Sequence, residues 1–201
     1  MRAFIAVELP APLRRDLRTL QQKLAAALDA AGAAQTVRWT AVESIHLTLR
    51  FLGETDAAQA EALARGLKQI AAARAPLDLA LANVGCFPNF RRPNVVWAGV
   101  AGDVARLLHL QAPIEELARR AGFTPETRPF SPHLTLGRFR REASPAQLGR
   151  AGAALEAVAA TPAVRAWSGA LPVRQVALME SDLRPSGAVY TARGIFPLSA
   201  A

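Results

Sequence analysis

Apolar residues recur along this chain with two different periods, and the changes of period divide it into elements. Alternating or short continuous apolar stretches, which are typical of strands, occupy residues 4–9, 37–39, 45–52, 76–87, 95–100, 133–136, 173–180 and 188–198. Elsewhere apolar residues recur every three or four positions, and this spacing predicts helices over 13–31, 56–74, 103–121 and 145–159. Turn-forming residues separate the elements, as in 88–94 and 185–187.

One tetrapeptide, His-Leu-Thr-Leu, occurs twice in predicted strands, beginning at His46 and at His133. The chain has only 3 histidines, and the chance that two of them open the same tetrapeptide is about one in a thousand at average residue frequencies, which indicates a duplicated unit. Because side chains alternate across a strand, His46 shares a face with Thr48, and His133 with Thr135, while the leucines face a core. Two such strands side by side would bring two imidazoles and two hydroxyls around one cleft.

The order of the elements repeats as well. A strand, a helix, a motif strand and a second helix occur in each half, and no Ser/Gly-rich linker divides the halves. We therefore predict a single domain over residues 1–201 of the α+β class, with two similar lobes, a pseudo-twofold axis and an active-site cleft between the lobes. The hairpin-like segments near the C-terminus favour antiparallel or mixed sheets with outer helices over a doubly wound parallel sheet.

The composition indicates the general class of protein to which this chain belongs. Hydrophobic residues make up 51% of the chain, enough for a substantial core, but no apolar run approaches the length of a membrane span. The first residues lack a signal-peptide pattern. We therefore expect a cytoplasmic monomer without membrane contacts. The single cysteine, Cys86, excludes an internal disulfide, and its apolar neighbours predict a buried structural thiol.

The charge of the chain is compatible with a nucleic-acid partner. The 24 basic and 16 acidic residues give a net charge of +8, which suits a phosphate-bearing ligand. A chain this rich in alanine and arginine can owe its charge to codon bias alone. The charge therefore supports a nucleic-acid partner without establishing one.

A pair of histidines can supply a base and an acid at neutral pH, because the ordinary imidazole pKa is about 6.5. In-line displacement at phosphorus uses both: a base takes the proton of the attacking oxygen, and an acid protonates the leaving oxygen on the opposite side. The hydroxyls of Thr48 and Thr135 can then hold non-bridging oxygens, and Arg138 offers a guanidinium for phosphate. Strict alternation puts Arg138 on the face opposite His133, so its use requires a bulge or twist, which Gly137 could supply.

Other roles for the histidines fit the sequence less well. A metal site lacks ligands, because Glu43 is the only carboxylate near either motif. A nucleophilic Ser131 would point away from its strand neighbour His133. A purely structural role leaves two imidazoles on strands without any chemistry. The third histidine, His109, lies next to leucines in a predicted helix and fits a packing or surface role.

The motifs and their surroundings resemble the two-histidine phosphoesterases, and among them the bacterial and archaeal RNA 2′,3′-cyclic phosphodiesterases, also called 2′-5′ RNA ligases. The similarity covers nearly the whole chain. Besides the two His-x-Thr-x motifs it rests on Phe4-Ile5-Ala6-Val7, Arg38-Trp39, Phe51-Leu52-Gly53-Glu54, Pro132, Gly137-Arg138 and Tyr190.

The resemblance implies hydrolysis of a 2′,3′-cyclic phosphate at an RNA end, such as that of a tRNA fragment, to a 2′-phosphate, with no metal and no cofactor. By this similarity His46 is the proton donor to the leaving 3′ oxygen, and His133 is the proton acceptor that activates water. The residues implied to bind phosphate are Thr48, Thr135 and Arg138. The weaker candidates for stacking on a base are Phe4 and Trp39, although core packing fits Phe4 better.

Several alternatives to this function stay open at the level of the sequence. A non-catalytic RNA- or nucleotide-binding module on the same fold belongs to a different class, but binding alone would not need both histidines. The enzymatic alternatives are 2′-5′ RNA ligation and action on another cyclic phosphate, such as a small cyclic nucleotide, a nicotinamide-derived metabolite or a cyclic oligonucleotide.

Overall fold

The computed structural model describes residues 1–166, 169–184 and 187–200. The long elements follow the order expected from the apolar pattern; residues 185 and 186 of the expected turn lie outside the described residues. The strands and helices are β1 Arg2–Glu8, α1 Ala11–Ala30, η1 Ala34–Thr36, β2 Val37–Trp39, η2 Val42–Ser44, β3 His46–Glu54, α2 Ala57–Ala72, β4 Leu77–Phe87, β5 Val95–Gly102, α3 Val104–Arg120, β6 His133–Phe139, α4 Pro145–Ala159, α5 Pro162–Arg165, β7 Ala170–Val173, β8 Gln175–Arg184 and β9 Gly187–Pro197.

Four short elements, η1, η2, α5 and β7, were not predicted. β7 contains Pro172, which lacks an amide donor and argues against a strand in a sequence-based interpretation. In the structure β7 lies at an edge of the sheet and pairs with β4, and an edge strand tolerates proline. The predicted strand from residue 173 therefore divides at Arg174 into the end of β7 and the start of β8.

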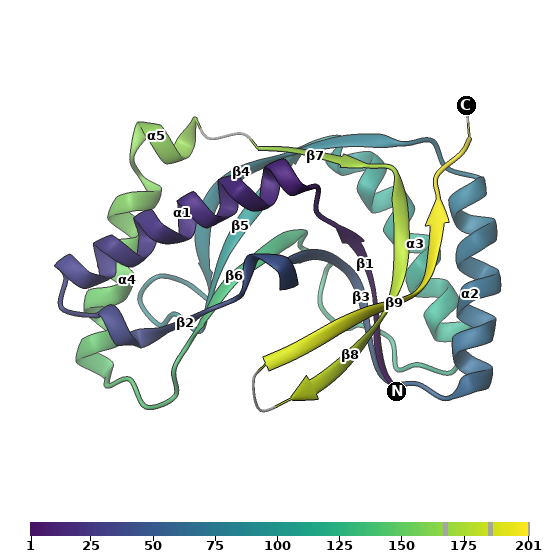
Figure 1. The fold of residues 1–201 in the computed structure, drawn as a ribbon, viewed down its shortest axis with the longest axis horizontal. Helices are drawn as coiled ribbons and strands as arrows, with labels where there is room; N and C mark the ends of the chain where they lie inside the picture. The colour runs from purple at the N-terminus through teal and green to yellow at the C-terminus, as the bar shows by residue number, and fades with distance from the viewer. Residues whose placement is uncertain (167–168, 185–186, 201) are drawn as a thin grey trace.

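The strands form one nine-stranded sheet in the order β7-β4-β5-β6-β3-β1-β8-β9, with β2 paired to β6 (Figure 1). Every strand pairing in the described part of the chain is antiparallel, so no mixed sheet occurs there. The motif strands β3 and β6 are neighbours and pair through Leu47 and Leu134. The duplicated histidine strands therefore lie side by side at the centre of the sheet, as the repeat predicts.

The two lobes of the sheet are not the two halves of the sequence. Outward from the central pair, β3-β1-β8-β9 on one side corresponds to β6-β5-β4-β7 on the other. β8, from the second repeat, pairs with β1, and β4, from the first repeat, pairs with β5. The helices cross over as well, because α1 packs against α4 and α2 against α3. Each lobe is therefore built from both repeats.

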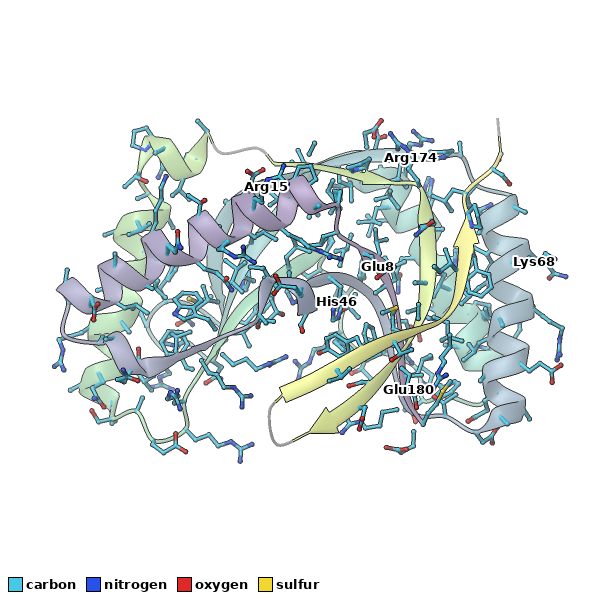
Figure 2. The ribbon with its side chains drawn as sticks, viewed as in Figure 1. Glu8, Arg15, His46, Lys68, Arg174 and Glu180 are labelled. Atoms are coloured by element: carbon cyan, nitrogen blue, oxygen red, sulfur yellow. The ribbon has the colours of Figure 1, made fainter. Side chains whose placement is uncertain are left out.

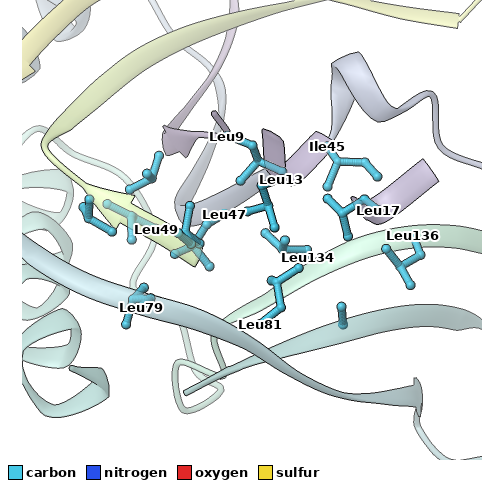
Figure 3. Packing of buried hydrophobic residues seen from close by; sticks show 14 of the residues in the cluster. Leu9, Leu13, Leu17, Ile45, Leu47, Leu49, Leu79, Leu81, Leu134 and Leu136 are labelled. Carbon is cyan, nitrogen blue, oxygen red and sulfur yellow. The ribbon is translucent and has the colours of Figure 1, made fainter. Parts of the chain in front are cut away.

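The main core lies between the helices and one face of the sheet. The motif leucines belong to the same buried cluster as the apolar stripe of α1, and Figure 3 shows both sets packed together. Burial of a leucine side chain contributes about 1.5–3 kcal/mol, so this cluster is the main source of stability. The members from α1 and from the two motifs are Leu13, Leu17, Leu20, Leu24, Leu28, Leu47, Leu49, Leu134 and Leu136.

A smaller cluster covers the other face of the sheet, on the lobe that contains β1. It consists of Phe4, Ala6, Ala177 and Met179, with Tyr190 packed against them. Because Phe4 and Ala6 alternate with Ile5 and Val7 of the main core, β1 is buried on both faces. One of the two motif histidines packs against this second cluster.

Two further expectations concern Cys86 and the membrane. Cys86 is buried and free, and burial raises the pKa of its thiol to about 12, in agreement with a structural thiol. Within the described residues, no helix combines the length and the apolar character needed to cross a membrane.

Two glycines of α4 provide a test of how this helix docks. A Cβ at Gly152 would lie 1.8 Å from the carbonyl oxygen of Phe90, whereas a Cβ at Gly149 would meet nothing within 4 Å. We expect Gly149→Ala to raise the free energy of unfolding by about 0.5–1 kcal/mol, since alanine is the better helix former. Gly152→Ala should lower it by about 1–3 kcal/mol through overpacking. Urea denaturation measures both, and equal stabilities of the two variants would contradict this packing.

Candidate active site on the central strands

The two motifs present their polar residues on the face of the sheet opposite the main core. His46, Thr48, His133 and Thr135 are all half-buried, whereas the leucines between them are buried. The pairing of Leu47 with Leu134 sets the two strands in register, so the four polar side chains belong to one short stretch of the central pair. Neither threonine hydroxyl is hydrogen-bonded to another residue in the part of the chain that the structure describes. Both hydroxyls are therefore available to a ligand.

Both imidazoles are anchored in the same way. Nδ1 of His46 lies 2.9 Å from the carbonyl oxygen of Ser44, and Nδ1 of His133 lies 2.8 Å from that of Ser131. A carbonyl oxygen can only accept, so Nδ1 carries the proton in each ring. Nε2 is then the atom of each histidine that is free to take or give a proton. The sequence signal for this device is the repeated Ser-x-His spacing, which lies outside the tetrapeptide and was missed for that reason.

A bulge interrupts each motif strand at the fourth residue of the motif. The register between β1 and β3 skips Leu49, and the register between β5 and β6 skips Leu136. The carbonyl oxygens of these two residues accept hydrogen bonds from glutamine side chains, at 3.4 Å from Nε2 of Gln111 and at 2.8 Å from Nε2 of Gln21. Each glutamine comes from the other repeat, so the crossed helices hold both bulges.

The second bulge changes the face of the sheet on which Arg138 lies. Leu136 and Gly137 are both buried, and the next residue, Arg138, is exposed. The break in alternation brings Arg138 to the face of His133, and its charge acts on Tyr190 of β9, where it partly opposes the burial that raises the phenol pKa. The expected bulge is present one residue before Gly137. The residue at the corresponding position after the first bulge is Phe51, which is 59% exposed.

His46 is enclosed by aromatic rings. The ring of Phe4 stacks on the imidazole at a centroid distance of 4.5 Å, and the ring of Tyr190 meets it edge-on at 5.2 Å. In Figure 2 His46 lies next to the β8–β9 hairpin that carries Tyr190. Burial lowers the pKa of His46 to about 4, and the hydrogen bond to Ser44 opposes this only in part. The imidazole is therefore neutral at neutral pH in the free protein.

His133 has a different aromatic neighbour. Phe87 of β4 meets its imidazole edge-on at 4.9 Å, and Trp97 of β5 lies 5.1 Å from Phe87. The Trp97 indole occupies the space over Gly85, where a Cβ would come within 2.2 Å of the ring. Glycine at this position leaves room for the indole beside the second motif.

Some of the remaining candidate residues from the sequence contact the two motifs, and others do not. Phe4 is 3% exposed and contacts His46, whereas Trp39 is half-buried against the main core beside Gly137. The carboxylate of Glu43 pairs with Arg18 at 2.7 Å. His109 is exposed on α3, away from the motifs. Among the described residues, no group of three or more His, Cys, Asp and Glu side chains could hold a metal ion.

The burial of His46 predicts how the free energy of unfolding depends on pH. The unfolded chain binds a proton at this imidazole near pH 6.5 and the folded chain only near pH 4, so protonation favours the unfolded state between these values. The free energy of unfolding should therefore fall as the pH is lowered through this window, by up to about 3 kcal/mol from His46. In urea denaturation at several pH values, His46→Gln should remove this part of the loss. An identical pH dependence in both proteins would mean that His46 is not buried in this way.

Comparison with known proteins places this site in a family. The LigT like phosphoesterase family matches the chain twice, over residues 7–97 and 100–190. A Methanothermobacter thermautotrophicus protein named RNA 2′,3′-cyclic phosphodiesterase is 30% identical over 198 residues, which are 98% of this chain and 99% of the relative. The crystal structure of Escherichia coli LigT complexed with 3′-AMP has a TM-score of 0.76 at 26% identity and covers 99% of this chain and 98% of that one. A crystal structure of a Thermus thermophilus protein has a TM-score of 0.72 at 28% identity, over 98% of both chains. This chain therefore belongs to the LigT like phosphoesterase family.

Proposed function

We propose that this protein hydrolyses 2′,3′-cyclic phosphates at RNA ends to 2′-phosphates, with one histidine as base and the other as acid. The observation that carries the proposal is the pair of imidazoles on one face of the central strands, each fixed through Nδ1 and each with an Nε2 that no hydrogen bond from the described residues occupies. The name of the full-length Methanothermobacter relative supports RNA cyclic phosphate as the substrate. A binding module would need neither the fixed tautomers nor two imidazoles.

In the proposed reaction His133 takes a proton from water through Nε2 as the water oxygen bonds to phosphorus. The bond from phosphorus to the 3′ oxygen breaks, and His46 donates a proton to that oxygen, which leaves a 3′ hydroxyl and a 2′-phosphate. Thr48, Thr135 and Arg138 hold the non-bridging oxygens as the charge on them grows. No metal has a part in these steps, which the residues present supply themselves.

The burial of His46 suits a donor that is charged only when substrate is bound. The pKa of about 4 leaves its imidazole neutral in the free protein. The anionic phosphate beside it favours the imidazolium and raises the pKa, because an opposite charge within a few ångströms stabilises the charged form. Binding of the substrate thus favours protonation of His46, and His46 then donates this proton in the reaction.

The histidine roles can be separated by the leaving group. With an RNA that ends in a 2′,3′-cyclic phosphate, we expect a 2′-phosphate product in excess chelator, and loss of most of the rate in both His46→Ala and His133→Ala. A nitrophenyl ester, whose leaving oxygen needs no proton, should partly rescue His46→Ala and leave His133→Ala inactive. Activity that chelator abolishes and one divalent metal restores, or rescue of neither variant, would refute the mechanism.

Phe51 is the proposed platform for the base next to the reacting phosphate. Its ring is exposed, lies 6.3 Å from that of Phe4 and occupies the position that Arg138 has in the other repeat. Stacking on a base contributes about 1–3 kcal/mol, so Phe51→Ala should raise KM for a cyclic nucleotide about 5- to 150-fold with little change in stability. Ile195→Ala is the control, since Ile195 is also exposed, at 50%. Equal KM values for the two variants would exclude Phe51 from the base site.

A further inference from the structure

A row of arginines continues from the second motif along β6 and β2. Arg38 of β2 lies opposite Arg138 of β6, and the register continues because the amide of Arg140 donates to the carbonyl oxygen of Thr36 at 2.8 Å. Residues opposite each other, and residues two apart in one strand, share a face. Arg38, Arg138 and Arg140 therefore lie on the same face as His133, and all three are exposed.

The loop of residues 88–94 adds Arg91 and Arg92 beside this row. It begins next to Phe87, whose ring contacts His133, and the Asn89 side-chain oxygen accepts the amides of Arg91 and Arg92, both at 3.0 Å. Asn94 closes the loop, because its amide donates to the carbonyl oxygen of Phe87 at 2.7 Å and its carbonyl oxygen accepts from the Phe139 amide at 2.9 Å. Both arginine side chains are exposed on a loop that is tied to the end of β6.

None of these five arginines, which we call the arginine face, makes an ion pair or a side-chain hydrogen bond within the described residues. Several arginines elsewhere are paired, among them Arg18 with Glu43, Arg174 with Asp78 and Arg193 with Glu180. The acidic residue nearest to Arg140 in the sequence is Glu142. Both residues line a hollow of about 410 Å³. Unpaired cations in such a row leave a strong positive potential for a polyanion.

We propose that the arginine face binds the phosphodiester backbone of the RNA strand that carries the cyclic end, so that a polyribonucleotide is a better substrate than a free cyclic mononucleotide. This rests on the proposed function of the adjacent site. Aromatic side chains surround His46 and arginines extend from His133, so the terminal base and the upstream phosphates have separate places to bind. Arginine contacts to phosphates fix the position of a strand without reading its sequence, and the preference for length should be independent of sequence.

The test compares adenosine 2′,3′-cyclic phosphate with a short oligoribonucleotide that ends in the same group. For the wild-type protein we expect a higher kcat/KM for the oligonucleotide, and an advantage that shrinks between about 50 and about 200 mM salt. Arg91→Gln/Arg92→Gln should reduce the salt slope for the oligonucleotide by about 1.4, at about 0.7 for each lost phosphate contact on a single strand. Its activity on the mononucleotide should be unchanged, which also shows that the variant is folded. Arg38→Gln/Arg140→Gln should behave in the same way.

The matched control is Arg15→Gln/Lys68→Gln, which removes the same charge from α1 and α2, away from His46 (Figure 2). It should leave both substrates and the salt slope unchanged. Equal kcat/KM for the two substrates in the wild type, or an oligonucleotide advantage that survives in Arg91→Gln/Arg92→Gln, would overturn the arginine face as the binding surface. Absence of hydrolysis of both substrates would instead reject the proposed function, so the two failures are distinguishable.

Discussion

The pairing of Leu47 with Leu134 is the contact on which the rest of the molecule depends. It joins the two lobes into one sheet and sets the register of the two motif strands. Side chains alternate with a period of two, so a slip of one residue by either motif strand would turn its imidazole into the main core and its leucines toward the opposite face of the sheet. The buried motif leucines make such a slip costly, because each would lose about 1.5–3 kcal/mol of burial. The packing of the core therefore also aligns the two histidines.

A duplicated unit supplies two equivalent imidazoles, but acid–base chemistry needs two different ones. The difference comes from their surroundings: His46 is covered by Phe4 and Tyr190, and burial lowers its pKa to about 4, whereas Phe87 meets His133 only at an edge. The two repeats also differ in the residue that follows each bulge at the equivalent position. This residue is the charged Arg138 in one repeat and the exposed Phe51 in the other. A symmetric fold thus carries an asymmetric site.

The parts of this structure that could be predicted from sequence are those set by local periodicity. The shared faces of His46 with Thr48 and of His133 with Thr135 follow from alternation over three residues. The place of Arg138 depends on a bulge, which alternation alone cannot locate. The contact of Tyr190 with His46 joins residues far apart in the chain and depends on which strand β8 pairs with. The interlocked repeats were missed for that reason, since apolar spacing identifies strands but not their partners.

The crossed helices explain why the whole chain is needed for one small site. Gln21 of α1 belongs to the first repeat and holds the bulge of the second motif, and Gln111 of α3 does the converse. The bulge at Leu136 in turn directs Arg138, so the position of a phosphate-binding candidate depends on a helix that begins more than a hundred residues earlier. Neither repeat alone contains both a motif strand and the glutamine that shapes it. The active-site geometry is therefore a property of the assembled pair, and it forms only when both repeats have folded together.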